Sequence, residues 1–232
     1  MLKKVLKKIK ELIDEEKSNE KPKNLYALFA YTGSDGRFDY EKYKSIQIEG
    51  NKKKIESVWV LEENIQFLSQ YIKNHLQDVK FGLCHGTRRG KEQEWFRKYL
   101  DAEVLGTEIS DTANQFPHTI QWDFHEVKDE WVNNVDFIYS NSFDHSYDPK
   151  KCLDNWMKCV SANGICILEH TSEHVSATEL DPFGADVMLM PYLVLLWGEG
   201  KYCVTEILEA PAKKESLTYT QYLVIRNFGK NN

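Results

Sequence analysis

The chain has 232 residues, of which 41% are hydrophobic and 28% are charged, and its formal net charge at pH 7 is −6. This size fits one α/β domain with a terminal extension. The negative charge argues against a protein that binds nucleic acid through bulk electrostatic attraction, so no nucleic-acid partner is expected.

Cysteine usage and the lack of long apolar runs predict a cytoplasmic protein. The five cysteines are scattered and form no C-x-x-C pair, so the sequence suggests neither a zinc site nor a disulfide framework. Lysines interrupt the first apolar residues, so no secretory signal peptide is expected. No apolar run approaches the ~18 residues that are needed to span a bilayer.

Residues 1–24 are expected to form an amphipathic helix, over 1–17, followed by a polar linker. Apolar residues recur there at helical spacing with lysines between them. Such a helix can lie on an anionic membrane surface, pack on its own domain, or contact a second subunit in a homodimer. The pattern leaves these three interpretations open.

Residues 25–60 are expected to form an accessory segment that contributes a lid. Leu25–Tyr31 has the composition of a strand, and Thr32–Gly36 that of a turn. The residues from 37 to 58 are mixed and charged, and their pattern favours no element.

From residue 61 to 232 the pattern alternates between strands and helices. Helices are expected over Glu62–Leu76, Lys91–Leu100 and Pro149–Val160. Parallel strands are expected over Val79–Cys84, Ala102–Gly106, Thr119–Trp122, Val135–Ser140 and, after a turn at Asn163–Gly164, Ile165–Leu168. A long insertion over Thr171–Gly200 precedes two final strands with no helix between them, Tyr202–Leu208 and Tyr219–Arg226. The fold predicted is therefore α/β, with a mostly parallel, doubly wound, seven-stranded sheet that ends in an antiparallel hairpin.

Polar features follow four successive strands of this sheet. Gly86 and Gly90 form a turn that leads into a helix, Glu108 and Asp123 follow the next two strands, and Asn141–His145 follows the fourth. In an open parallel sheet, ligands bind at the carboxyl ends of the strands. Glycine lets the backbone approach a ligand, and a carboxylate can accept hydrogen bonds from two ribose hydroxyls. The pattern predicts a nucleotide-like ligand at this edge.

These motifs resemble those of the class I S-adenosylmethionine-dependent methyltransferases, over about residues 60–228. The resemblance implies a Rossmann-like fold and S-adenosylmethionine as cofactor, with Glu108 on the ribose and Asp123-Phe124 at the adenine. Cys84 and Arg88 depart from the family's first motif, which often has an acid and a glycine there. The cofactor-binding residues that the resemblance implies are Cys84, His85, Gly86, Thr87, Arg88, Gly90, Glu108, Ile109, Asp123, Phe124, Asn141 and Ser142. Arg88 or Arg89 is expected to pair with the cofactor carboxylate.

The loop after the fourth strand supplies the first candidate for a catalytic base, His145, because imidazole titrates near neutral pH. A structural or cofactor-binding role for His145 is the alternative. His170 is the second catalytic candidate, and the candidate substrate-binding residues are Asp144, His174 and Tyr192. No metal-ligand spacing stands out, so we expect a metal-independent enzyme.

The function predicted is methylation of a small polar acceptor, with O-methylation of a sugar or glycan precursor as the first hypothesis. A nicotinamide-dependent Rossmann oxidoreductase is one alternative, although the sequence lacks a full G-x-G-x-x-G turn. A non-catalytic S-adenosylmethionine-binding or scaffold protein is the other, because of the departures at Cys84 and Arg88.

Overall fold

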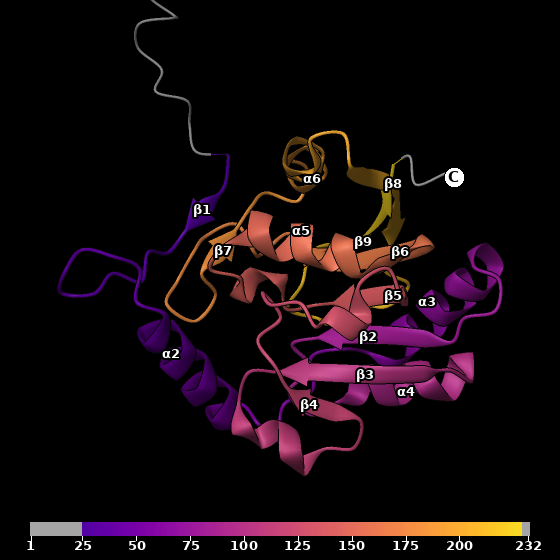
Figure 1. Cartoon of the computed structure of the whole chain (residues 1–232), viewed down its shortest axis with the longest axis horizontal. Helices are drawn as coiled ribbons and strands as arrows, with labels where there is room; N and C mark the ends of the chain where they lie inside the picture. Colours follow the sequence, from indigo (N-terminus) through magenta and orange to yellow (C-terminus); the bar gives the residue numbers. More distant parts are fainter. Residues whose placement is uncertain (1–24, 229–232) are drawn as a thin grey trace, which may run out of the picture.

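The computed structural model describes residues 25–228, so the helix and linker expected over 1–24 lie outside the described residues. A seven-stranded sheet in the order β4-β3-β2-β5-β6-β9-β8 forms the centre, with helices on both faces (Figure 1). Its strands are β2 (Phe81–His85), β3 (Glu103–Glu108), β4 (Thr119–Gln121), β5 (Val135–Ser140), β6 (Val160–Thr171), β8 (Tyr202–Glu209) and β9 (Thr220–Asn227).

The strands from β2 to β6 are parallel, and β9 is antiparallel to both β6 and β8. The predicted fold class, including the terminal hairpin, is therefore confirmed. The main helices are α3 (Glu62–His75), α4 (Lys91–Leu100), α5 (Pro149–Cys159) and α6 (Met190–Gly198). Short 3-10 turns follow three strands, η1 (Asp111–Gln115), η2 (Asp129–Trp131) and η3 (Phe143–His145).

Alternation along the strands divides the hydrophobic core into two layers. On β5, Phe137 and Tyr139 pack with residues of α3 and α4, whereas Ile138 packs with Trp156 of α5 on the opposite face. Successive side chains of a strand point to opposite faces, so a buried parallel sheet needs apolar residues on both. The sheet therefore holds its polar groups mainly at the strand ends, where the site lies.

The strand expected over Leu25–Tyr31 is much shorter in the structure. Only β1 (Ala27–Leu28) is extended, and it pairs with β7 (Phe183–Gly184) within the insertion rather than with the main sheet. The Phe29 N–H still donates to the carbonyl of Pro182, but proline has no N–H with which to continue the ladder, and Tyr31 is buried in the core.

The turn expected at Asn163–Gly164 lies inside β6 as an irregularity of the strand. Residues 161–164 stand between Val160 and Ile165, whose partners on β5, Val135 and Phe137, are only two positions apart. This extra length is a bulge, so β6 begins earlier than the sequence pattern indicates. It also ends later, at Thr171.

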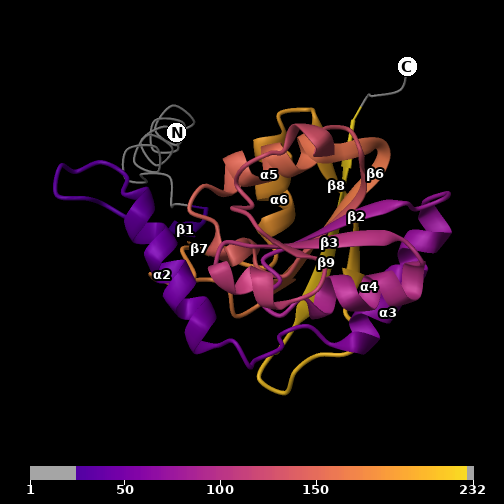
Figure 2. The same ribbon diagram turned by 60° about the horizontal axis from the view of Figure 1, so that its bottom comes forward.

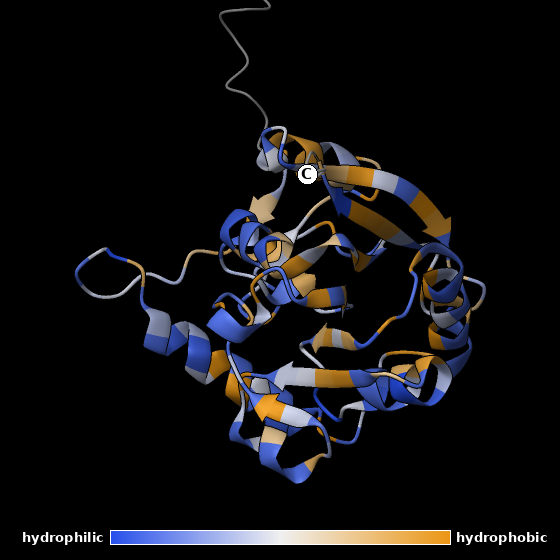
Figure 3. Ribbon diagram, turned by 45° about the vertical axis from the view of Figure 1, so that its right-hand side comes forward, coloured by the Kyte–Doolittle hydropathy of each residue, from blue (hydrophilic) through white to orange (hydrophobic). Residues whose placement is uncertain are grey.

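Helix α2 (Tyr40–Lys53) occupies the stretch for which the sequence favoured no element. Asp39 caps it by accepting a hydrogen bond from the Lys42 N–H at 2.9 Å. The helix lies beside the sheet, at the end to which the arrowhead of β3 points, and is mostly hydrophilic (Figures 2 and 3). The division between an accessory segment over 25–60 and a main domain over 61–232 stays a prediction.

Within residues 25–228, no helix combines the length and the apolar character that a membrane span requires.

Gly82 on β2 gives a prediction about the core. It pairs directly with Phe137, and a Cβ at Gly82 would lie 2.2 Å from a carbon of that buried ring. Gly82→Ala should therefore lower the free energy of unfolding by about 1–3 kcal/mol through overpacking. Urea denaturation measures the loss. Gly33→Ala is the control, because its Cβ would approach no atom closer than 3.3 Å; equal stability of the two variants would contradict the prediction.

Candidate active site

The site lies where the chain order of the sheet reverses. β2 has β3 on one side and β5 on the other, so the turns after β2 and β5 diverge and leave a crevice. Ser142 Oγ donates to the carbonyl oxygen of Gly86 at 3.0 Å and joins the two turns. Gly86 has φ 76°, and a Cβ there would lie 2.5 Å from Ser142 Cβ. The close approach of the two turns therefore requires glycine.

A pocket of about 560 Å³ opens at this point. It is lined by eight residues that the sequence singled out, which are Gly86, Arg88, Glu108, Ile109, Asp123, Phe124, Ser142 and His145. Six further lining residues were missed, and they are Tyr43, Gln47, Gly50, Asn51, Lys54 and Leu180. Five of these six belong to α2 or follow it directly, and Leu180 belongs to the insertion.

Glu108 ends β3 with a buried carboxyl group that lines this pocket. Its Oε1 accepts a hydrogen bond from the Ser110 N–H at 2.9 Å, and its Oε2 accepts one from the Arg88 N–H at 3.2 Å. Burial raises the pKa of Glu108, and these two backbone donors offset part of that rise. Each oxygen keeps a second lone pair, so the group can still accept two hydroxyl hydrogen bonds from a ligand.

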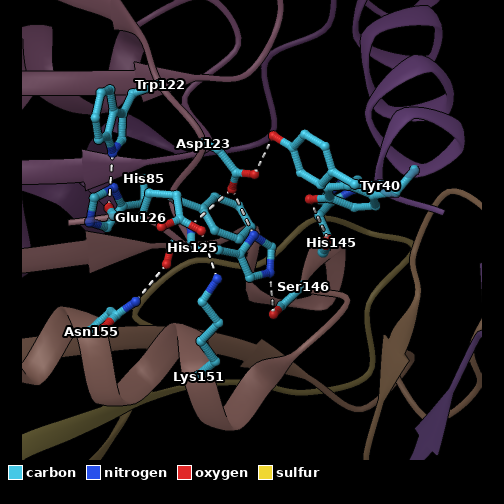
Figure 4. A network of polar contacts seen from close by, with 12 residues as sticks. Tyr40, His85, Trp122, Asp123, His125, Glu126, His145, Ser146, Lys151 and Asn155 are labelled. Carbon is cyan, nitrogen blue, oxygen red and sulfur yellow. Dashed lines mark hydrogen bonds and ion pairs between the residues drawn. The ribbon is translucent and has the colours of Figure 1, made fainter. Parts of the chain in front are cut away.

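Asp123 was expected to contact an adenine, but protein donors already engage both of its oxygens (Figure 4). Oδ1 accepts from the backbone N–H and the Nδ1 of His125, and Oδ2 accepts from the Tyr40 hydroxyl at 2.8 Å. Burial raises the pKa of Asp123, but the hydrogen bonds and charge of His125 outweigh burial and leave it below its usual range. The carboxylate mainly anchors the loop after β4 and helix α2.

His125 was missed by the sequence interpretation and connects Asp123 to Ser146. Its Nδ1 lies 2.7 Å from Asp123 Oδ1, and its Nε2 lies 2.8 Å from Ser146 Oγ. This connectivity is that of a catalytic triad, but His125 and Ser146 have no exposed surface, so no substrate reaches the hydroxyl. Burial lowers the pKa of His125 and favours the neutral ring. The network is therefore structural. The i, i+2 spacing of Asp123 and His125 was the available signal.

Helix α2 is held over the pocket by polar contacts with three separate loops. The Tyr43 hydroxyl donates to the His145 carbonyl at 3.2 Å, and Gln47 Nε2 donates to the Leu180 carbonyl at 2.9 Å. Asn51 Oδ1 accepts a hydrogen bond from the Thr112 hydroxyl at 2.8 Å. The helix thus forms one wall of the pocket.

His145, at the end of η3, lines the pocket next to α2, with its Nδ1 bound and its Nε2 left for a ligand. Its Nδ1 lies 2.8 Å from the Leu180 carbonyl oxygen and 2.9 Å from Gln47 Oε1. Because both partners are acceptors, we assign the proton of the neutral ring to Nδ1. The lone pair is then on Nε2, as a general base requires.

The other candidates from the insertion and β6 lie outside the lining of this pocket. His170 is buried, and its Nε2 lies 2.9 Å from the Ala185 carbonyl oxygen, while burial lowers its pKa. His174 Nε2 lies 3.6 Å from Asp144 Oδ2. Tyr192 is half exposed on α6. The structure brings Asp144, His170 and His174 together beside the pocket, and Tyr192 is not among them.

Cys84 and His85, expected to bind cofactor, turn their side chains into the two core layers. Cys84 is fully buried towards α3 and α4, and burial raises the pKa of its thiol. His85 stacks on Trp156 at 4.6 Å on the opposite face, and burial lowers its pKa to about 3. Gly90 begins α4 and is also absent from the lining. This placement leaves only backbone atoms of Cys84 and His85 near the turn.

A second pocket, of about 280 Å³, adjoins the first and shares Gly86, Arg88 and Ser142 with it. Two more of the expected cofactor-binding residues, Thr87 and Asn141, line this second pocket. The two pockets together therefore contain nine of the twelve expected residues, all except Cys84, His85 and Gly90.

One group within residues 25–228 has ligand atoms near enough to hold a metal ion. Asp144, His145 and Asp181 each offer a nitrogen or oxygen, and these atoms lie within 4.8 Å of one another. To bind a metal ion through Nδ1, His145 would have to give up its hydrogen bonds to Gln47 Oε1 and the Leu180 carbonyl. The donor set suits a divalent cation, but the existing hydrogen bonds already engage Nδ1.

No protein-family model matches the sequence, and no curated protein matches it. Solved structures do. A Burkholderia thailandensis 1,6-didemethyltoxoflavin-N1-methyltransferase with bound 1,6-didemethyltoxoflavin and S-adenosylhomocysteine superposes with a TM-score of 0.63 at 13% identity, covering 90% of this chain and 98% of that one. A SAM-dependent methyltransferase from Aquifex aeolicus gives 0.52 at 14% identity, covering 82% and 98%.

A Rhodobacter sphaeroides protein named for zinc-dependent alcohol dehydrogenases gives a TM-score of 0.56 at 10% identity and covers 82% of this chain and 100% of that one. Identities this low establish the fold and not the activity. The chain has the fold of the class I methyltransferases.

Proposed function

We propose that this chain is an S-adenosylmethionine-dependent methyltransferase that acts on a small polar acceptor and releases S-adenosylhomocysteine. The observation that carries the proposal is the Glu108 carboxylate, which lines a pocket at the switch point together with the apolar side chains of Ile109 and Phe124. An acidic acceptor between apolar walls suits an adenosine, whose ribose donates hydrogen bonds and whose base is flat and apolar on its faces. The residues present therefore fit the cofactor.

His145 is the proposed base. The cofactor supplies an electrophilic methyl group on a sulfonium sulfur. With the cofactor bound, His145 Nε2 would take the proton of the acceptor hydroxyl as that oxygen accepts the methyl group. Asp181 Oδ1, 3.8 Å from Nδ1, stabilises the positive charge that the ring then carries.

A sugar or glycan precursor is our first proposal for the acceptor, with O-methylation as the reaction. The wall that α2 forms leaves a confined pocket lined by hydrogen-bonding side chains, including Gln47, Asn51 and Lys54. Such a lining suits a small molecule with several hydroxyl groups. The structure of the Burkholderia protein holds a small heterocycle, so an acceptor screen should also include heterocyclic amines as the alternative class.

Two other functions are distinguished by ligand titration. A nicotinamide-dependent oxidoreductase should be stabilised by nicotinamide nucleotides in a thermal-shift assay, and a methyltransferase by S-adenosylmethionine and S-adenosylhomocysteine. A non-catalytic scaffold would bind the S-adenosyl compounds and release no S-adenosylhomocysteine with any acceptor. Failure of both S-adenosyl compounds to stabilise the protein would exclude the proposal.

Replacement of Glu108 tests the cofactor site. Glu108→Ala should weaken S-adenosylhomocysteine binding by about 1–3 kcal/mol, because it removes a charged hydrogen-bond acceptor. Isothermal titration calorimetry measures the change. Glu103→Ala, at the exposed start of the same strand, is the matched control and should bind as the unchanged protein does. Unchanged affinity in Glu108→Ala would remove the ribose assignment.

Replacement of His145 tests the base. With the best acceptor from a panel of monosaccharides, nucleotide sugars and heterocyclic amines, His145→Asn should lower kcat by about 10²–10⁴-fold. Its affinity for S-adenosylhomocysteine should stay within about threefold of the unchanged protein. His75→Asn, on the exposed side of α3, is the control. Normal turnover by His145→Asn would assign the histidine to orientation of the loop.

Chelation tests the expectation of metal independence. EDTA should leave turnover unchanged, because His145 Nδ1 is occupied by its two carbonyl partners. Loss of activity in EDTA, with recovery on addition of Mg²⁺ or Mn²⁺, would instead assign Asp144, His145 and Asp181 as ligands of a catalytic ion.

A further inference from the structure

The second pocket contains an acid and a base with no partner of opposite charge. Glu92, in the first turn of α4, is 5% exposed and accepts a hydrogen bond from Asn141 Nδ2 at 3.2 Å. Arg88 donates from Nη1 to the carbonyl oxygen of Ser57 at 3.2 Å. Among the described residues, no ion pair within 4.0 Å includes either side chain. Buried charges are normally paired, so this pocket has the character of a site for a charged ligand.

The two cationic side chains nearest in sequence, Arg89 and Lys91, do not pair with Glu92. Lys91 Nζ is bound to Glu94 at 2.7 Å, and Arg89 is paired with Glu56, so both of these cations face away to other partners. Glu92 and Arg88 carry opposite charges and line the same pocket, but they form no ion pair with each other. That arrangement is complementary to a zwitterion, which carries an ammonium and a carboxylate on one carbon.

We propose that Glu92 binds the α-ammonium group of the methionine part of the cofactor, while Arg88 faces its carboxylate. This assignment rests on the proposed function, and it places the amino-acid part in the second pocket and the adenosine part in the first. The shared residues Gly86, Arg88 and Ser142 make the two pockets one continuous site. Cys84, near the end of β2, is buried in the core, so the turn itself supplies no acid.

The surroundings of Glu92 couple binding to a proton. Burial raises the pKa of Glu92 to about 7; its own backbone N–H and Asn141 lower it, Glu169 of β6 raises it further, and Arg88 lowers it. Cys84 on β2 and Tyr139 on β5 also face this carboxyl group, and burial holds both of them neutral. An arriving ammonium stabilises the ionised form, so ligand binding should expel a proton.

The sign of the pH effect follows from the raised pKa. At about pH 6, one tenth of Glu92 is ionised in the free protein, and at about pH 8 nearly all of it is, so affinity should rise about tenfold over this interval. The folding stability of the free protein should change with pH in the opposite sense to the ligand affinity. An acid whose pKa is raised by folding makes the fold progressively less stable as the pH rises from 4.5, its ordinary value, to about 7, and the loss is constant above that.

The test is titration calorimetry with S-adenosylhomocysteine from about pH 6 to about pH 8, in phosphate and imidazole buffers, whose different ionisation heats reveal proton release. Binding to the unchanged protein should tighten about tenfold over this interval, and it should release close to one proton at about pH 6 but almost none at about pH 8. Glu92→Gln should lose this pH dependence and bind at least about tenfold more weakly at about pH 8. Glu94→Gln, exposed on the same helix, is the matched control.

5′-Methylthioadenosine, which lacks the amino-acid part, separates this inference from the proposed function. It should bind the unchanged protein and Glu92→Gln equally at every pH, which also shows that the variant is folded. If Glu92→Gln binds S-adenosylhomocysteine with the affinity and pH dependence of the unchanged protein, the Glu92 assignment is wrong and the cofactor site stands. If the unchanged protein binds neither compound, the proposed cofactor itself is wrong.

Discussion

The site depends on one contact between two turns, that of Gly86 with Ser142. β2 and β5 lie side by side but their chains leave in opposite directions, and the Ser142 hydroxyl bonds the Gly86 carbonyl across the gap. The Ser140 hydroxyl makes the same kind of bond to the His85 carbonyl one residue earlier. These bonds fix the base of the crevice, and both pockets include Gly86 and Ser142 in their walls. The positions of Glu108, Glu92 and His145 are all set relative to this contact.

The site gathers carboxyl groups that are stabilised by hydrogen bonds rather than by cations. Glu108 is held by two backbone N–H groups, and Glu169 at the end of β6 accepts from Trp59 Nε1 and the Tyr139 hydroxyl at 2.9 and 2.8 Å. Burial raises the pKa of Glu92, Glu108 and Glu169 alike. A ligand that carries net positive charge offsets this desolvation cost when it binds. A sulfonium that also bears an ammonium group has that property.

Apolar periodicity predicted the elements whose buried faces are apolar. The helix expected over Lys91–Leu100 and the strand expected over Val135–Ser140 occur with those bounds, because Phe96 and Phe137 belong to the core. Helix α2 was not predictable in this way. Three of its four buried residues are Gln47, Gly50 and Asn51, so the face that packs on the protein is polar and produces no hydrophobic stripe.

Spacing along strands located the site but did not decide which side chains face it. Glu108 and Asp123 both follow strands, yet only tertiary contacts show that Asp123 is engaged by His125 and Tyr40. Cys84 and His85 end β2, and strand alternation sends their side chains into opposite core layers. The sequence did not single out Glu92, because an acid in the first turn of a helix is common. Its burial depends on tertiary packing, which the sequence pattern does not show.

The polar underside of α2 has a thermodynamic consequence. If this helix moves away to admit a ligand, the surface exposed is mostly amide and backbone, since Tyr43 is the single aromatic residue among the four it buries. Water can replace the hydrogen bonds of Gln47 and Asn51, whereas it cannot replace apolar packing. Such a movement would change the heat capacity little, because apolar exposure raises it and polar exposure lowers it. The enthalpy of opening the pocket would then be nearly the same at all temperatures.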